Sequence, residues 1–89
     1  MSLTVDVNVL VYASDESSAF HAKALELVER LARGPDLLYL FWPVVMGYLR
    51  IATHPAIFLR PLSVAAATEN IEQLLARPHT RAPGEGDTF

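Results

Sequence analysis

The run LTVDVNVLVYA, residues 3–13, constrains the fold most, because β-branched and apolar residues there surround one carboxylate and one carboxamide. An apolar run without strict alternation is typical of a strand buried on both faces of a parallel sheet. Burying an unpaired carboxylate is costly, so we expect Asp6 to lie where this strand ends. In open parallel sheets, ligands bind at the edge formed by those strand ends.

A polar loop, residues 14–18, separates this run from an amphipathic helix. Ser17 or Ser18 is the expected N-cap, and Gly34-Pro35 is the expected stop, with glycine at positive φ. The residues expected to form the buried stripe are Phe20, Ala24, Leu27, Val28 and Leu31. Glu26 and Arg30 are four residues apart on the charged side, which we expect to be solvated surface.

The short apolar run 37–41 predicts a second strand, parallel to the first, with the preceding helix as the crossover. Pro43 suits the first turn of a following helix, which we expect to run from Val44 to about Thr53. This helix is apolar almost all round, with Arg50 as its charged residue. Such a helix must be covered by the sheet, another helix or a second subunit.

Ser63 is the expected N-cap of a last helix that ends near Arg77-Pro78. Its apolar positions are Val64, Ala67, Thr68, Ile71, Leu74 and Leu75, at helical spacing. The rest of the chain is predicted to be loop with a short strand at 79–81, and Glu85 and Asp87 are interpreted as loop charges.

Composition narrows the class of protein. The 89 residues make at most one domain, and the formal net charge of −3 argues against a generally basic nucleic-acid binder but not against a nuclease built on carboxylates and a metal. There is no cysteine, so a reducing cytoplasm is the expected location. The longest uncharged apolar stretch, residues 37–49, is too short to span a membrane. No membrane partner is therefore expected.

Two phrases of the sequence resemble one protein family. Residues 5–10, VDVNVL, followed by Tyr12-Ala13, and residues 47–55, GYLRIATHP, are similar to PIN-domain proteins, in particular VapC-type toxins of toxin–antitoxin systems. The resemblance implies an α/β, three-layer fold in which helices flank a parallel sheet. It makes residues 1–89 the amino-terminal two thirds of a PIN-like domain, with the later strands and helices absent.

The same resemblance implies a site and a chemistry. Asp6 would hold Mg²⁺ or Mn²⁺ in a metal-dependent endoribonuclease, and Asn8 would start the following helix and orient the carboxylate. Asn8 is also a good N-cap on physical grounds. Arg50 is a candidate contact for RNA phosphate, and His54, one turn further, is a weaker one. Gly47 stands where many PIN domains carry a second metal-binding glutamate, which indicates close packing or space for substrate.

The implied partners are an RNA substrate, a second copy of the chain and a cognate antitoxin protein. One aspartate does not hold a hard divalent cation against water, and the two later aspartates of the family have no counterpart here, so this chain is not expected to catalyse by itself. The alternative interpretation is a catalytically dead PIN-like module for oligomerisation or partner binding. A phosphoacceptor receiver domain fits less well, because it would need paired acids beside Asp6. The spacing of His21, His54 and His79 is not that of a zinc site.

Overall fold

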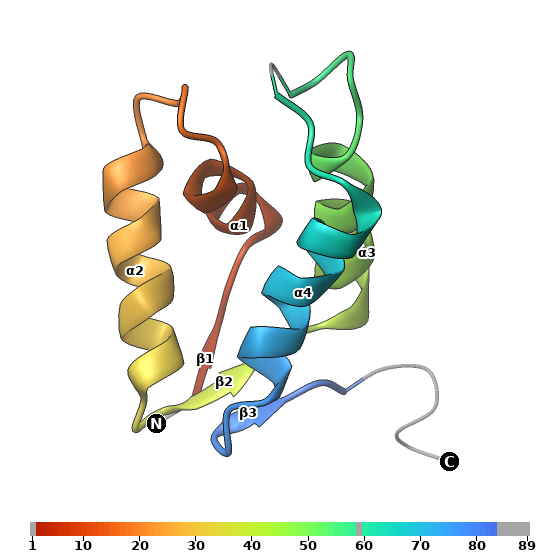
Figure 1. Cartoon of the computed structure of the whole chain (residues 1–89). Coiled ribbons are helices and arrows are strands. Elements are labelled where there is room, and N and C mark those ends of the chain that lie inside the picture. Colours follow the sequence, from red (N-terminus) through yellow and green to blue (C-terminus); the bar gives the residue numbers. More distant parts are fainter. Residues whose placement is uncertain (1, 59, 84–89) are drawn as a thin grey trace.

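A computed structural model describes residues 2–58 and 60–83. The element order is β1 (Ser2–Thr4), α1 (Val7–Ser14), α2 (His21–Arg33), β2 (Leu37–Tyr39), α3 (Trp42–Ala52), α4 (Val64–Leu75) and β3 (Thr80–Arg81). The strands form one parallel sheet in the order β1-β2-β3, as Figure 1 shows. The predicted α/β class, the parallel pairing of the first two strands and the short strand near residue 80 are confirmed.

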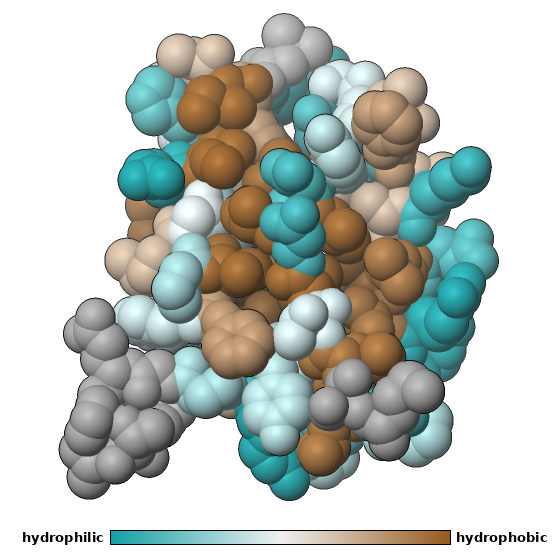
Figure 2. Space-filling view, turned by 180° about the vertical axis from the view of Figure 1, so that it is seen from behind, coloured by the Kyte–Doolittle hydropathy of each residue, from teal (hydrophilic) through white to brown (hydrophobic). Residues whose placement is uncertain are grey.

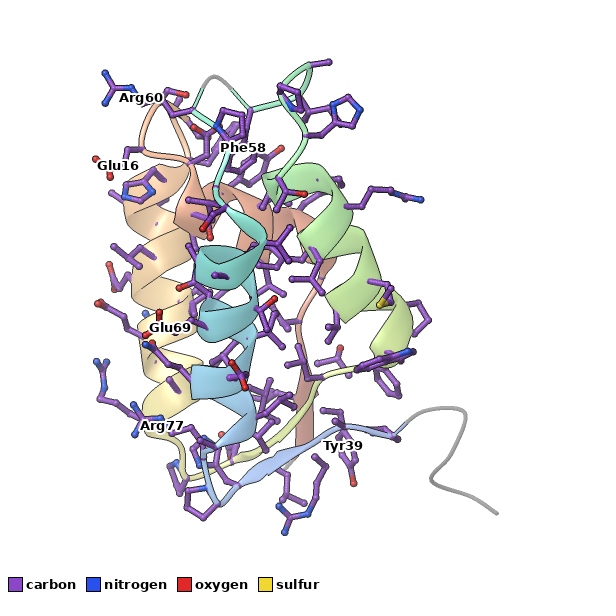
Figure 3. All side chains as sticks on the ribbon, turned by 45° about the vertical axis from the view of Figure 1, so that its right-hand side comes forward. Glu16, Tyr39, Phe58, Arg60, Glu69 and Arg77 are labelled. Carbon is purple, nitrogen blue, oxygen red and sulfur yellow. The ribbon has the colours of Figure 1, made fainter. Side chains whose placement is uncertain are left out.

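All four helices lie on one side of this sheet (Figure 1). The reason is topological: both crossovers step in the same direction along the order β1-β2-β3, and right-handed crossovers then fall on the same face. Leu38 and Leu40 point to the helices and are 1% and 0% exposed. Tyr39 points away from the helices (Figure 3), and Phe41 is 42% exposed. The residues described here therefore make two layers, one of helices and one of strands.

The helices enclose a single apolar core with the inner face of the sheet. Its residues are Val5, Leu10, Leu38, Leu40, Val45, Tyr48, Ala52, Phe58, Ala67, Ile71 and Leu74. The expected cover for the apolar helix α3 comes from α1 and α4, which both pack against it. Among the helices of the described ranges, none is long and apolar enough to cross a membrane.

The helix α2 differs from its prediction at its start and along its buried stripe. The N-cap is Phe20, not Ser17 or Ser18, because the Ser18 hydroxyl accepts a bond from the Phe20 amide and closes a turn before the helix. Only Ala24 is buried, whereas Phe20 is 59% and Leu27 37% exposed. Since α2 packs mainly on α1, the part of its stripe beyond that contact remains open to solvent.

The end of α2 and the starts of α3 and α4 are set by the residues at those positions. Gly34 ends α2 with φ +78°, the positive φ that was predicted, and Ser63 caps α4 through a 3.0 Å bond from the Ala66 amide to its hydroxyl. The helix α3 begins at Trp42, two residues earlier than expected, with Pro43 in its first turn. Val64, expected on the buried stripe of α4, is instead 70% exposed because it is the first residue of the helix and projects beyond the core.

Candidate functional site

Asp6 lies between β1 and α1, on backbone that is still extended, and its side chain is exposed. The strand was predicted to end at this carboxylate; β1 ends two residues earlier, at Thr4, and Asp6 follows it as predicted at the edge of the sheet. Asn8 is not the N-cap, and that prediction is wrong. Asp6 itself is the cap: its Oδ1 accepts a 3.4 Å bond from the Asn8 amide, and α1 begins at Val7. Aspartate and asparagine cap helices about equally well, so residue type alone did not decide between them.

The surroundings of Asp6 follow from the parallel sheet. Thr4 pairs with Tyr39, so Asp6 and Phe41 each lie two residues beyond a paired position at the same edge of the sheet. The helices α1 and α3 both begin at this edge. Helix amino termini carry partial positive charge, which favours a carboxylate or a phosphate placed beside them. We call the region formed by Asp6, Phe41 and Trp42 the carboxyl edge.

Gly47 packs against the start of α1. A Cβ built on Gly47 would lie 3.4 Å from Cγ2 of Val7, the residue that follows Asp6. This is an ordinary van der Waals separation, so the helices α1 and α3 approach closely here without leaving a cavity for a ligand. Position 47 is therefore next to the carboxyl edge, but it supplies no second carboxylate.

The donor set for a metal is incomplete within residues 2–58 and 60–83. No group of three or more His, Cys, Asp or Glu side chains in those ranges is arranged to hold an ion. Glu85 and Asp87 lie outside the described residues. A small divalent cation is commonly held by one or two carboxylates together with waters and substrate phosphates. Asp6 alone fits as one such ligand and does not amount to a metal site.

Each of the three histidine rings makes its own hydrogen bond to the backbone. The ring of His21 bonds to the carbonyl of Tyr12 at 3.0 Å, and that of His79 bonds to the carbonyl of Leu31 at 2.8 Å. His54 uses its Nδ1 to accept the Ala56 amide within the turn after α3. This turn contact gives His54 a structural role.

Arg50 is exposed in the last turn of α3. It lies eight residues after Trp42 and four after Met46, so these three side chains share one face of the helix. Trp42 is 46% and Met46 51% exposed, whereas Val45, which packs into the core, is 2% exposed. The exposed Arg50 could therefore bind a phosphate of a strand that also contacts Trp42. Its role in binding RNA remains a prediction.

A groove that the sequence did not reveal lies between α2 and α4, and residues of α1 and α3 also line it. Its volume is about 350 Å³, and its lining mixes apolar side chains with polar and charged ones. Glu29 of α2 and Arg77, which follows the end of α4 and is labelled in Figure 3, are charged residues of this lining.

Three polar side chains of this lining are hydrogen-bonded to one another around a buried tyrosine. The hydroxyl of Tyr48, a residue only 1% exposed, lies 2.7 Å from the Ser14 hydroxyl and accepts a 2.9 Å bond from the Asn70 side-chain amide. The cluster thus joins α1, α3 and α4. Tyr48 belongs to a helix that was predicted to be apolar almost all round, but a buried tyrosine hydroxyl normally needs a partner, and that requirement was the available signal.

Hydrophobic residues also gather across the middle of the face shown in Figure 2, with hydrophilic residues around them. A second, more open hollow on the outer side of α1 and α2 is lined by Val9, Tyr12, Phe20, Lys23, Ala24 and Leu27. The rings of Tyr12 and Phe20 lie 5.2 Å apart in it. The described residues therefore leave several large apolar side chains exposed, among them Phe20, Trp42 and Met46.

Comparison with known proteins gives a consistent set of relatives. Ribonuclease VapC48 of Mycobacterium tuberculosis is 54% identical over 89 residues, which is all of this chain and 61% of the relative. Ribonuclease VapC43 of the same species is 40% identical over 85 residues, and ribonuclease VapC37 is 34% identical over 74 residues. These alignments cover 58% and 51% of those two relatives. The chain thus spans less than two thirds of the length of these proteins. No protein-family model matches it.

Proposed function

We propose that this chain carries the amino-terminal part of a VapC-type ribonuclease with a PIN-like fold, acting on RNA phosphodiester bonds. The observation that carries the proposal is the exposed Asp6 at the carboxyl end of β1, in a chain that is 54% identical along its whole length to a protein named ribonuclease VapC48. The parallel sheet with crossover helices is compatible with a PIN-like fold. In the complete three-layer domain, further segments would cover the side of the sheet to which Tyr39 points.

Asp6 is proposed as a ligand of Mg²⁺ or Mn²⁺, together with donors outside the described residues and with the substrate itself. Such an ion supplies a water of lowered pKa and positive charge against the phosphate. Asn8 contributes through its backbone amide, which donates to the Asp6 carboxylate and limits its rotation. Arg50 would bind a phosphate further along the same edge, as a bidentate donor.

The proposed partners are an RNA substrate, a second copy of the chain and a cognate antitoxin protein. They are suggested by the VapC-type relatives and, for protein partners, by the exposed apolar residues on α2 and α3. We place the protein in the cytoplasm, where RNA and the reducing conditions suited to a cysteine-free chain are found.

The second candidate is a catalytically dead PIN-like module that binds a protein partner. Two observations favour it: the described residues hold one carboxylate at the carboxyl edge where a metal needs more, and the groove between α2 and α4 offers a protein partner both apolar and polar contacts. In this case the partner would occupy the groove and RNA cleavage would be absent.

A cleavage assay separates these candidates. The protein is expressed from its complete open reading frame, titrated with Mn²⁺ and incubated with RNA, alongside Asp6→Asn. This variant keeps the N-cap and removes the charge. We expect cleavage to fall by about 100-fold or more, because even changes outside the first ligand shell of a metal site cost roughly 10- to 100-fold.

Asp15→Asn is the matched control. Asp15 also follows an element end, as the C-cap of α1, and accepts bonds from Ser17, but it lies at the opposite end of α1. It should cleave at the parent rate. Cleavage that is unchanged in Asp6→Asn contradicts the proposed role, and no cleavage by the parent protein at any Mn²⁺ concentration favours the binding module.

A further inference from the structure

We propose that the side chain of Arg81 seals the outer edge of β3 and so prevents a strand of another copy of the chain from pairing there. The outer edge of β3 here means three backbone groups: the Thr80 amide and the carbonyls of Pro78 and Thr80. Strand β3 is the last in the order β1-β2-β3 (Figure 1), and such a strand presents unpaired backbone groups unless something occupies them. This seal is independent of the proposed ribonuclease function.

The bonds between β2 and β3 show which backbone groups face outward. The His79 carbonyl accepts a 2.9 Å bond from the Leu38 amide of β2. The Arg81 carbonyl accepts a 2.8 Å bond from the Leu40 amide, just beyond β2. Successive residues of a strand direct their backbone groups to opposite sides, and Thr80 lies between these two acceptors. Its own amide and carbonyl therefore face away from β2, where an added strand would bond to them.

These outward groups are already bonded within the chain. The Thr80 amide donates to the Arg77 carbonyl at 3.0 Å. Nη1 of Arg81 donates to the Thr80 carbonyl at 3.1 Å and to the Pro78 carbonyl at 2.7 Å. Proline has no amide hydrogen to offer. A strand that approaches β3 must therefore displace the guanidinium before it can bond to either carbonyl.

Other features of β3 act in the same direction. The strand is only two residues long, and Pro78 and Pro83 lie on either side of it. Short length, prolines and charged side chains are common means by which edge strands avoid pairing with other chains. Arg81 differs from the prolines because it bonds to the edge itself. A single substitution can therefore remove the seal and leave the strand in place.

The seal is compatible with a three-layer domain. In the register of the sheet Arg81 pairs with Tyr39, so its side chain begins on the side to which Tyr39 points. The guanidinium then turns back to its own strand, where both acceptors lie along the edge. Segments that cover the face of the sheet would leave these two bonds intact.

The variant Arg81→Ala tests the seal, because it removes the guanidinium and frees the two carbonyls. We expect sedimentation velocity to show association at about tenfold lower protein concentration than for the parent chain, the order of effect of two hydrogen bonds. The assemblies should add an intermolecular β-sheet band to the infrared spectrum. Circular dichroism should show unchanged helix content, because Arg81 is exposed and these bonds stay within its own turn and strand.

Arg60→Ala is the matched control. It changes the net charge by the same amount, and Arg60 is also exposed but lies in the loop before α4, far from β3 (Figure 3). It should associate as the parent does, including any association through other surfaces. Both variants are also measured in 1 M NaCl, where charges are screened beyond roughly 3 Å. The difference between them should persist there, because salt screens charge and leaves hydrogen bonds in place.

Three results would overturn the seal. The first is equal association of Arg81→Ala and Arg60→Ala at low salt. The second is a difference that disappears in 1 M NaCl, which would assign the protection to the charge of Arg81 and not to its bonds. The third is association of Arg81→Ala without the infrared band, which would place the new contact on a surface other than the strand edge.

Discussion

The two ends of α1 differ in how their polar side chains are exposed and hydrogen-bonded. At its start, Asp6 is exposed and accepts one bond of 3.4 Å. At its end, Ser14 meets the hydroxyl of Tyr48, which is almost fully buried and also bonded to Asn70. A buried group with all its partners contributes to stability, whereas an exposed carboxylate with spare acceptor capacity is available to a ligand. The same helix thus has a structural end and an end suited to chemistry.

The largest effect on stability is expected at the buried end. Tyr48→Phe removes the hydroxyl that Ser14 and Asn70 share, which should lower the free energy of unfolding by about 0.5–1.5 kcal/mol, since both partners reach solvent and can bond to water instead. Urea denaturation measures it. Tyr39→Phe is the control, since the Tyr39 hydroxyl points away from the helices (Figure 3) and should change stability little. Equal losses in the two variants would remove the distinction between the two ends of α1.

Metal binding at the exposed end of α1 can be tested by adding a second carboxylate near Asp6. Gly47→Glu places a second acid next to Val7, and we expect it to raise Mn²⁺ affinity by about tenfold, because cation affinity in oxygen sites follows the number of charged ligands. Isothermal titration calorimetry measures this change. Gly47→Ala controls for helix propensity, which alone should stabilise the chain by about 1 kcal/mol.

The gain in Mn²⁺ affinity must depend on Asp6 if the two carboxylates share an ion. Adding Asp6→Asn to Gly47→Glu should return the affinity to that of the parent chain. A double variant that binds Mn²⁺ as tightly as Gly47→Glu alone would place the ion elsewhere and contradict the proposed ligand role of Asp6.

The smallest effect concerns capping. Asp6→Ala should cost about 1 kcal/mol or less of stability, and Asp6→Asn only a few tenths, because asparagine restores the cap. Ser63→Ala is the comparison: its bond to Ala66 is 3.0 Å, against 3.4 Å at Asp6, so its loss should be the larger in thermal unfolding. A greater loss at Asp6 would mean that this carboxylate is mainly structural.

Features set by neighbouring residues could be predicted from the sequence. The cap at Ser63 and the positive φ at Gly34 depend on side-chain chemistry within a few residues, and both are confirmed. The pairing of β1 with β2 was also predictable, since a helical segment between two apolar runs favours a right-handed parallel crossover. Asp6 at the strand end followed from the cost of burying charge.

Features set by distant residues were beyond the sequence. The hydroxyl partners of Tyr48 come from positions 34 residues earlier and 22 residues later, and no local pattern relates them. The exposure of Phe20 and Leu27 has the same origin, because periodicity identifies a stripe but not whether another element covers it. The N-cap of α1 could not be predicted because Asp6 and Asn8 are residue types that cap helices about equally well.

The end of α2 carries a consequence for mutational scans of this protein. A side chain at position 34 would bring its Cβ to 3.1 Å from the imidazole of His79, whose own carbonyl accepts the Leu38 amide. Even a single methyl group there would push on a strand 46 positions later in the chain. Alanine at this turn should therefore behave in a deep scan like a core lesion, and shrinking residue 79 should relieve the part of the loss that comes from this contact, while the strain of φ +78° remains.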